Sequence, residues 1–496
     1  MTPTDHVAIQ ARLQPDRLAA VDLAGDRRWT YAQLDTDVAR AVGVLRRRGV
    51  RAGDRLATLA RNRVLLGVLH LACARLGAMF VPLNWRLSAA EIAALIEDAA
   101  PTLVVGDAHL AAFGLDGVDL DALQAEVDAA EPEAAGPADR ERPSLILYTS
   151  GTSGRPKGAL LSERNLDQTA INFGRLGKLT HQSVFLVDAP MFHIIGLITS
   201  IRPALMHGGT VVVSDGFEPA RTLKRLGDPA LGVTHYFCVP QMAAMLRQAP
   251  NFDASTLRRL TAVFTGGAPH PAADIRAWLA DGLPIVDGYG MSEAGTVFGM
   301  PADLALIDAR AGSAGLAMPA VATRIVDEQD EDCPPGVAGE LLLKGDNVFL
   351  GYWRRPEETA RAFTADGWFR TGDIARADAE GYHWLVDRKK DMFISGGENV
   401  YPAEIEAALA DHAAIAECAV VGMPDPRWGE IGHLVAACRE GAMLDLAAIL
   451  DHLENRLARY KLPKALTLVA ALPRTASGKI QKAILREQLL SEDPRP

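Results

Sequence analysis

Cysteine is scarce in this sequence and is never clustered. The 496 residues include only five cysteines, at positions 73, 238, 333, 418 and 438, with no Cys-x-x-Cys pair and no histidines gathered near them. A disulfide framework or a zinc site would need such spacing, so neither is expected to organise the fold. The pattern is typical of a reducing compartment, and we expect a cytoplasmic protein.

The chain also lacks a basic excess and a long uninterrupted apolar run. Its net charge of −11 argues against nucleic acid as a partner. No basic segment followed by an apolar core opens the sequence, which argues against a signal peptide. The most apolar stretch, residues 65–85, is broken by His70 and Arg75, so it predicts a buried helix and a strand rather than a membrane span. The high alanine content is typical of a GC-rich bacterial genome.

Helical periodicity and short apolar runs alternate along most of the chain. The alternation is clearest at residues 38–47, 55–59, 65–76, 78–82, 103–105 and 145–147. Such a pattern predicts parallel sheets covered by helices. Residues 315–352 contain short segments separated by turn residues, which indicates a small β-rich piece. A chain of this length exceeds one core, so we expect at least two domains.

A polar loop at residues 148–158, Tyr-Thr-Ser-Gly-Thr-Ser-Gly-Arg-Pro-Lys-Gly, follows an apolar strand-like run. Its glycines allow the backbone N–H groups to approach phosphate oxygens closely, and Lys157 adds a positive charge. Lys157 precedes its glycine and no hydroxyl follows it, so this is not the common Gly-x-x-x-x-Gly-Lys-Ser/Thr loop. A Ser/Gly-rich linker would have low complexity and no flanking strand. The loop therefore predicts a phosphate site.

The loop resembles the phosphate-binding signature of the adenylate-forming superfamily, which includes acyl-CoA synthetases, luciferase and peptide-synthetase adenylation domains. The family's further signatures follow in order at residues 289–293 (Tyr-Gly-Met-Ser-Glu), 352–353, 368–373, 387–391, 395–399 and 473–479. On these motifs the chain is identified as a member of the superfamily, most similar to its AMP-forming acyl-CoA synthetases.

The resemblance implies an α/β fold in two domains. Residues 1–388 would form a large ATP- and acyl-binding domain of two helix-covered sheets plus a small β-barrel-like part. Residues 389–496 would form a small mobile α+β domain that carries a catalytic lysine. The resemblance places the hinge at Lys390, and a large rotation there would separate the two half-reactions.

The implied reaction uses ATP, Mg²⁺ and coenzyme A. A carboxylate attacks the α-phosphorus of ATP to give an acyl-adenylate and pyrophosphate, and a thiol then displaces AMP. Catalysis should depend on positioning and electrostatic stabilisation; the sequence has no Gly-x-Ser-x-Gly nucleophile elbow. By resemblance, Lys479 bridges the carboxylate and the α-phosphate, and Glu293 binds Mg²⁺ together with Thr152. His193 would gate the carboxylate end of the acyl pocket; taken alone, a histidine in an apolar run is more often a packed core residue.

The resemblance also assigns the nucleotide site. Tyr289 would stack on adenine, Asp287 would accept from its amino group, Asp373 would accept both ribose hydroxyls, and Arg388 would hold the ribose or α-phosphate. The other residues expected to contact ATP or AMP are Thr149, Ser150, Gly151, Thr152, Ser153, Gly154, Lys157, Gly267, Ala268, Pro269, Gly288, Gly290, Met291, Ser292 and Lys479.

The expected acyl pocket is apolar and is lined by His193, Ile194, Gly196, Tyr236, Phe237, Val239, Gly266, Gly288, Met291 and Val297. Relatives that take short diacids carry a basic residue where this chain has Gly288, so the pocket suits a hydrophobic monocarboxylic acid, fatty or aryl. Coenzyme A would contact Ser395, Gly396, Gly397 and Trp428, although a tryptophan can equally be a surface-packed aromatic. Glu163 replaces a histidine that many relatives carry, and we expect this change to be neutral.

Two alternatives stay open at this point. A stand-alone adenylation enzyme would load a carrier-protein thiol instead of coenzyme A; the segment around Trp428 favours coenzyme A. A degenerate relative would bind acyl-adenylates without making them, and the presence of Lys157, Glu293, Asp373 and Lys479 argues against it. The family suggests a homodimer, with no nucleic-acid or membrane partner.

Overall fold

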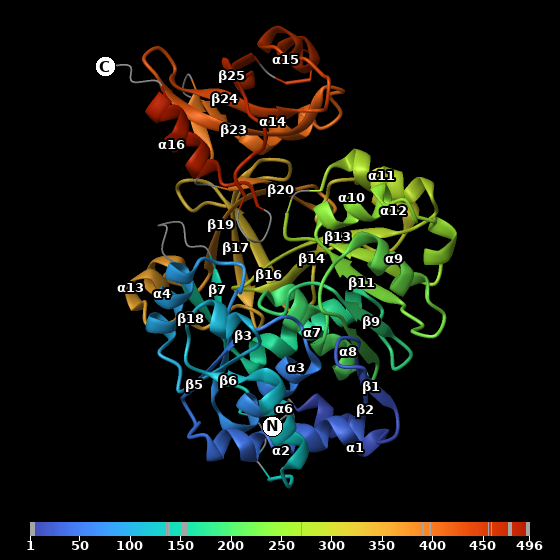
Figure 1. Cartoon of the computed structure of the whole chain (residues 1–496). Helices are drawn as coiled ribbons and strands as arrows, with labels where there is room; N and C mark the ends of the chain where they lie inside the picture. The colour runs from blue at the N-terminus through green and yellow to red at the C-terminus, as the bar shows by residue number, and fades with distance from the viewer. Residues whose placement is uncertain are drawn as a thin grey trace.

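The chain forms a large body and a smaller one, as the computed structural model shows (Figure 1). The structure describes residues 5–134, 136, 139–149, 156–268, 270–388, 391–395, 398–454, 456–457, 459–474 and 479–492. We call the described residues up to Arg388 the large body and those from Asp391 the small body. The small body, orange to red in Figure 1, stands above the large one. This arrangement matches the expected α/β class, and the boundary at residue 388 stays a prediction.

A nine-stranded sheet forms one half of the large body. Its strand order is β15-β14-β13-β12-β11-β9-β10-β1-β2. The bounds in this order are Leu316–Ala317, Gly295–Gly299, Ile285–Met291, Ala262–Thr265, His235–Cys238, Val184–Val187, Thr210–Val213, Leu18–Asp22 and Arg27–Thr30. The strands from β13 to β1 run parallel, and antiparallel strands close both edges. The carboxyl ends of the parallel strands therefore meet at one edge, where such sheets place ligands.

A seven-stranded sheet forms the other half, in the order β18-β8-β7-β4-β3-β5-β6. The bounds are Gly351–Tyr352, Lys157–Ser162, Pro143–Thr149, Met79–Pro82, Arg55–Leu59, Leu103–Gly106 and Val118–Asp119. The run at 145–147 lies in β7, and β8 returns antiparallel to it. The two strands thus bring both ends of the polar loop together.

The expected β-rich piece is a four-stranded antiparallel sheet in the described residues. It contains β16 (Val321–Val326), β17 (Gly339–Gly345), β19 (Phe369–Ala377) and β20 (His383–Arg388). Its strands carry Asp373 and Asp387, and β20 is the part of the large body that leads into the small one (Figure 1).

Helices cover the sheets, and some lie between them. The apolar α3 (Val64–Leu76) contacts β4 and β7 of one sheet and β1 of the other, which explains why it is hydrophobic on nearly all sides. It packs on α2 (Tyr31–Arg47), which begins with a capping box between Thr30 and Gln33. The remaining helices of the large body are α1 (His6–Leu13), α4 (Ala89–Ala99), α5 (His109–Ala112), α6 (Leu120–Ala129), α7 (Glu163–Leu176), α8 (Arg202–Met206), α9 (Pro219–Gly227), α10 (Pro240–Gln248), α11 (Ala272–Ala280), α12 (Leu304–Ala309) and α13 (Pro356–Ala362), with a π-helix at Ile195–Thr199 and a 3₁₀ turn at Ala254–Leu257.

The small body is a sheet covered on both faces. Its strands are β21 (Phe393–Ser395), β22 (Glu398–Val400), β23 (Ile415–Asp425), β24 (Gly429–Cys438) and β25 (Ala465–Leu468). Its helices are α14 (Pro402–Leu409), α15 (Leu446–Leu453) and α16 (Lys482–Glu492), with a 3₁₀ turn at Arg459–Lys461. Along β23, Val420 joins the core under α14 and α15, whereas Ala419 and Val421 join the core under α16. The alternation of strand side chains therefore supplies two hydrophobic layers.

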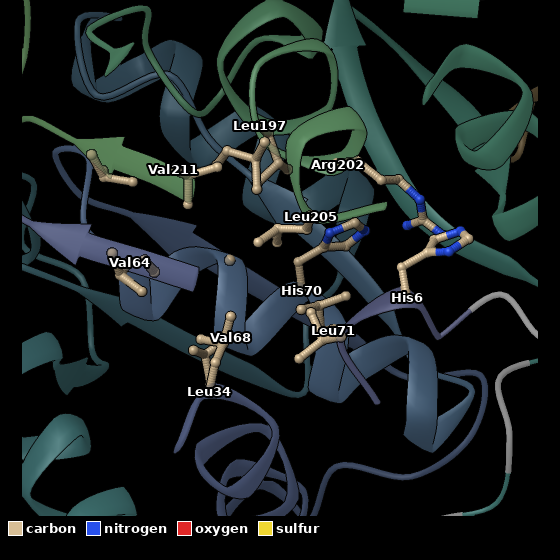
Figure 2. A pocket seen from close by; sticks show the side chains of 15 residues that line it. His6, Leu34, Val64, Val68, His70, Leu71, Leu197, Arg202, Leu205 and Val211 are labelled. Carbon is tan, nitrogen blue, oxygen red and sulfur yellow. The ribbon is translucent and has the colours of Figure 1, made fainter. Parts of the chain in front are cut away.

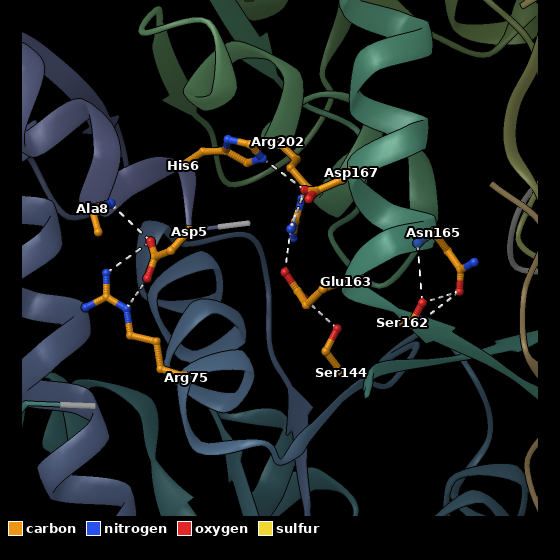
Figure 3. Close-up of polar contacts among 10 residues, drawn as sticks. All are labelled: Asp5, His6, Ala8, Arg75, Ser144, Ser162, Glu163, Asn165, Asp167 and Arg202. Carbon is orange, nitrogen blue, oxygen red and sulfur yellow. Dashed lines mark hydrogen bonds and ion pairs between the residues drawn. The ribbon is translucent and has the colours of Figure 1, made fainter. Parts of the chain in front are cut away.

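Glu163 is not a neutral replacement in structural terms, because its carboxylate is buried in an ion network (Figure 3). It accepts from the Ser144 hydroxyl at 2.6 Å and pairs with Arg202. Arg202 also contacts Asp167 at 2.8 Å, and His6 of α1 reaches the same Asp167 at 2.9 Å. Breaking a buried pair of this kind is costly. The network ties α1, α7 and α8 together, which a reading of the motif by itself does not reveal.

An apolar cavity of about 40 Å³ lies beside this network, between α1, α3, α8 and the strands β1 and β10 (Figure 2). His70 points into it, and its Nε2 atom has no hydrogen-bond partner among the described residues. Burial lowers the pKa of His70 to about 4, so the ring is neutral at pH 7. The space is large enough for a water molecule.

In the described residues, no helix combines the length and apolarity needed to cross a membrane.

Candidate active site

Thr149 and Lys157, near the two ends of the polar loop, face each other across β7 and β8. Thr149 and Lys157 are register partners, and the Thr149 hydroxyl donates to the Lys157 carbonyl at 3.4 Å. The Lys157 ammonium pairs with Glu358 and lies 5.2 Å from the centre of the Tyr352 ring. A Cβ atom at Gly158 would lie 2.7 Å from Ile146, so glycine is needed there. Ser150, Gly151, Thr152, Ser153 and Gly154 lie outside the described residues, and their assignments stay predictions.

Glu293 is a buried carboxylate held by the segment that follows β17. The Tyr352 hydroxyl donates to its side chain at 3.1 Å, and the Phe349 N–H donates to its carbonyl at 2.8 Å. The Asn347 amide also donates to the carbonyl of Ala294 at 2.7 Å. Tyr352 therefore links Glu293 to Lys157, one negative and one positive side chain of the predicted phosphate site. Thr152, the other expected Mg²⁺ ligand, is outside the described residues.

Tyr289 and Asp373 come from different sheets and meet in the site. The Tyr289 hydroxyl donates to the Asp373 carboxylate, and Asp373 is only 6% exposed. The Tyr289 ring packs on Phe298 with a centroid distance of 5.6 Å. Gly290, Met291 and Ser292 continue this edge as partly exposed residues. Arg388 is the register partner of Asp373, and its side chain lies outside what the structure describes.

Asp287 lies at the end of the parallel part of β13, beside Thr265 and His270. The Thr265 hydroxyl donates to its carboxylate at 3.0 Å, and the His270 ring nitrogen lies 3.9 Å from it. Burial raises the pKa of Asp287 to about 7, outweighing the hydrogen bonds from Thr265 and from the Gly288 backbone. Burial likewise lowers the pKa of His270 to about 4. A protonated Asp287 can donate as well as accept, so its role toward an adenine amino group is weaker than the motif implies.

We expect Asp287→Asn to change the pH dependence of stability. Because the folded-state pKa lies above the ordinary 3.8, the favourable contribution of the neutral acid is complete below that value and is lost as pH rises through 7. Asparagine stays neutral, so the variant should be more stable than the wild type at pH 8, by on the order of 4 kcal/mol. Urea unfolding between pH 4 and 8 measures this; a constant difference across that range would contradict it.

Glycines pack closely against their neighbours in and beside the set expected for the acyl pocket. An ideal Cβ on Gly267 would lie 3.5 Å from Ile195 and 3.9 Å from Val239, and one on Gly266 would lie 2.9 Å from the Gly288 carbonyl and 3.4 Å from the Phe237 ring. A Cβ on Gly288 would come within 2.8 Å of the Phe298 carbonyl, so a larger residue would clash with the neighbouring strand there. Ile194, Gly196, Val297 and Gly266 are buried, Met291 is partly exposed and Ala268 is exposed.

Tyr236 differs from its neighbours in this set. It alternates with Phe237 along β11 and therefore faces the opposite side of the sheet. Its side chain is fully buried, and its hydroxyl has no hydrogen-bond partner among the described residues. Phe237 lies beside Gly266, and the places of Phe237 and Tyr236 in an acyl pocket stay predictions. Pro269 is outside the described residues.

His193 precedes the π-helix at Ile195–Thr199, and its ring packs edge-on against Phe192 at 4.6 Å. Its Nε2 atom is buried without a hydrogen-bond partner in the described part of the chain. Burial, together with the charges of Lys479 and Arg86, lowers the pKa of His193 to about 4. The ring is therefore neutral at pH 7 and can bond to a carboxylate without carrying charge. Lys479 belongs to the small body, so a charge from that body contributes to the lowered pKa of His193.

The segment that carries Lys479 is fixed on both sides within the small body. A bridge joins Arg474 to Ile480, and the Gln481 N–H donates to the Pro473 carbonyl at 2.8 Å. Arg474 pairs with Glu417, which also accepts from the Leu472 N–H at 3.0 Å. These contacts hold the exposed Lys479 on an ordered base.

Two of the expected coenzyme A residues, Ser395 at the end of β21 and Trp428 in the turn between β23 and β24, lie near each other. Ser395 is the register partner of Gly429, next to Trp428. The Trp428 side chain is 39% exposed and lies 4.9 Å from the Arg427 guanidinium; its N–H donates to Asp425 at 2.9 Å. These contacts lie within the small body. Gly396, Gly397 and Lys390 lie outside the described residues.

Two features of the site went unassigned in the sequence. Tyr352 belongs to a motif, but its link between Glu293 and Lys157 requires the fold. Arg86 lies 4.9 Å from the centre of the Trp85 ring and 5.9 Å from that of Phe192, and so adds positive charge near His193. A basic residue next to a tryptophan in the turn after residues 79–82 was the available signal, and it is weak.

Comparison with known proteins identifies the family. The family model for AMP-binding enzymes matches residues 7–353, and that for the AMP-binding enzyme C-terminal domain matches residues 404–479. A feruloyl-CoA synthase of Amycolatopsis sp is 40% identical, with 97% of each chain covered. An indoleacetate–CoA ligase of Aromatoleum aromaticum is 39% identical, with 93% of each chain covered.

Two solved structures share the fold over nearly the whole chain. ATP-bound MatB from Rhodopseudomonas palustris superposes with a TM-score of 0.91 at 33% identity, covering 98% of this chain and 99% of that one. The o-succinylbenzoate-CoA synthetase of Bacillus subtilis in complex with ATP and magnesium ion gives 0.86 at 29% identity, covering 99% and 100%. The chain therefore belongs to the AMP-binding enzyme family, as an acyl-CoA ligase of the adenylate-forming superfamily.

Proposed function

We propose that this ligase activates a hydrophobic aryl acid of the cinnamate type and transfers it to coenzyme A. The observation that carries the proposal is the apolar surroundings of the closely packed Gly266 and Gly267, whose neighbours are Phe237, Ile195 and Val239. An apolar lining that suits a hydrophobic acid disfavours a second carboxylate. Relatives at 39–40% identity, named for ferulate and indoleacetate, support the same class.

In this proposal the described side chains act mainly by positioning charge. His193 would orient the acid carboxylate, Lys157 would neutralise phosphate oxygens, and Lys479 would stabilise charge between the carboxylate and the α-phosphate. Asp373 would exchange its bond with Tyr289 for the ribose hydroxyls, which frees the Tyr289 ring to pack on adenine.

Magnesium fits the donor set around Glu293. Mg²⁺ is usually held by one or two carboxylates together with substrate phosphates and water, and Glu293 offers a single buried carboxylate with Tyr352 holding one oxygen. When bound, the ion would neutralise charge on the phosphates. This arrangement favours Glu293 as its protein ligand.

Release of pyrophosphate and formation of acyl-CoA, measured with ATP, Mg²⁺ and coenzyme A over cinnamic, benzoic, fatty and dicarboxylic acids, test the proposal. We expect acyl-CoA from the cinnamic class. Acyl-CoA from fatty acids alone would replace the aryl assignment. Pyrophosphate release without acyl-CoA would favour a carrier-protein thiol, and no activity with any acid would refute the proposed function.

Filling the pocket should change substrate choice. Val239→Phe adds a ring beside Gly267 and Ile195, so we expect the KM for cinnamate to rise by on the order of 100-fold, while a short acid such as propionate is affected less than threefold. The short acid is the internal control. Equal effects on both acids would contradict the placement of Val239 in the acyl pocket.

A further inference from the structure

A group of charged side chains joins the two bodies close to the predicted hinge. Asp387 lies on β20 of the large body, where it is the register partner of Ile374, next to Asp373. Its carboxylate accepts at 2.8 Å from the N–H of Ala403, in the first turn of α14 of the small body. A carboxylate at a helix N-terminus is favoured by the exposed N–H groups and the helix dipole. This hydrogen bond therefore crosses from one body to the other.

The same helix continues the group toward α16. Glu406, one turn after Ala403, accepts from the Val420 N–H at 2.7 Å and pairs with the Lys482 ammonium at 2.9 Å. The two paired side chains are only 21% and 15% exposed. Burial lowers the pKa of Lys482, but the charges of Glu406 and Asp387 raise it by more than this, so the net direction of the pKa shift is upward. One carboxylate from each body therefore acts electrostatically on Lys482. We call Asp387, Glu406 and Lys482 the junction cluster.

Lys482 is also close to Lys479 in sequence, and a packed residue lies between them. It is the first residue of α16, three positions after Lys479, and the intervening Ile480 packs in the same hydrophobic cluster as Leu485 and Leu489 of that helix. A displacement of the α16 N-terminus would therefore displace Lys479 relative to His193. A small misplacement of Lys479 would lower the reaction rate strongly, because catalysis depends on positioning.

We propose that the junction cluster holds the small body in the orientation seen in this structure, so that Lys482 is a positioning residue for adenylate formation. The inference rests on the proposed function. Asp387 and Ala403 lie on opposite sides of the predicted hinge at Lys390, so a rotation there would separate them. The cluster stabilises one orientation and must open before the other is reached, which biases the equilibrium between the two.

The small body supplies a matched control. Lys461 pairs with Glu404 on the same helix α14 at 2.7 Å, and these side chains are 18% and 34% exposed. This pair resembles Lys482–Glu406 in length and burial and likewise lies within the small body, but Lys461 is far in sequence from Lys479, whereas Lys482 follows it by three residues. Lys461→Met therefore reports the general cost of losing an ion pair from α14.

The experiment compares the two half-reactions in Lys482→Met and Lys461→Met. We expect Lys482→Met to slow pyrophosphate release about tenfold, whereas thioester formation from supplied acyl-adenylate and coenzyme A changes less than twofold. Lys461→Met should leave pyrophosphate release within twofold of the wild type, and Lys482→Arg should restore most of the loss. Equal losses in both half-reactions, or equal effects of the two methionine variants, would overturn the proposal.

A second readout separates this inference from the proposed function. Spin labels at the exposed positions 328 and 440 report the distance between the bodies without any substrate. We expect Asp387→Asn and Lys482→Met to broaden this distance distribution and Lys461→Met to leave it unchanged. An unchanged distribution in Asp387→Asn would overturn the inference even if the enzyme makes acyl-CoA. Broadening in a protein inactive toward every acid would refute the proposed function alone. Asp387→Asn leaves the core of the small body intact, so the test stands if Lys482→Met fails to fold.

Discussion

Replacing Lys479 by alanine is expected to slow pyrophosphate release by about 10²–10³-fold. Its positive charge contributes to the lowered pKa of His193, the residue that we propose orients the acid carboxylate. A donor placed where negative charge develops stabilises the transition state without reorganisation, and its removal costs rate rather than substrate affinity. The loss should therefore appear in kcat, with the KM values for ATP and the acid changed only slightly.

The half-reactions distinguish this role from a structural one. Thioester formation from supplied acyl-adenylate and coenzyme A should proceed in Lys479→Ala at nearly the wild-type rate. That step does not include the attack of the carboxylate on the α-phosphorus, which is the step that the Lys479 charge would stabilise. Lys224→Ala, on the exposed side of α9, is the control for loss of a surface charge and should be unchanged. A similar loss in both half-reactions would show that Lys479 supports the fold and not the first chemical step.

Glu293→Gln is expected to produce the second large effect, a loss of about 10²-fold or more in pyrophosphate release at ordinary Mg²⁺ concentration. Glutamine keeps the shape of the side chain and can still accept from Tyr352, so the change removes the charge with little loss of packing. A neutral amide is a poor ligand for Mg²⁺. Activity should partly recover as the Mg²⁺ concentration rises.

A magnesium titration of the rate measures this effect. Glu358→Gln is the matched control, because Glu358 pairs with Lys157 and not with the metal in our proposal; its magnesium dependence should match that of the wild type. If Glu293→Gln has the wild-type magnesium dependence, Glu293 is not the ligand and its burial beside Tyr352 is structural.

The sequence predicted the local elements well where burial and periodicity agree. The strand expected at 55–59 is β3, and the helix expected at 65–76 is α3 with one residue added at its start. The strand before the polar loop was also found, as β7. These segments succeed because a strand or helix buried in a layered α/β fold leaves a short-range pattern of apolar residues.

Side-chain partners were not predictable in the same way. The sequence did not show that Glu163 pairs with Arg202, nearly 40 residues away. Nor did it show that Tyr236 and Phe237, both expected in the acyl pocket, lie on opposite faces of the sheet. Motifs preserve residue types at set spacings, but which face a strand presents depends on the register of the whole sheet.

By itself, the sequence determined the family, the class of chemistry and the α/β architecture, because the spacing of the motifs and the alternation of apolar runs are local properties of the chain. Only the tertiary structure decided that Tyr352 links Glu293 to Lys157, and that Asp387 contacts α14 beside the pair of Glu406 and Lys482. These pairs join segments far apart in sequence, and their geometry follows from the packing of whole sheets and bodies, which no short pattern records.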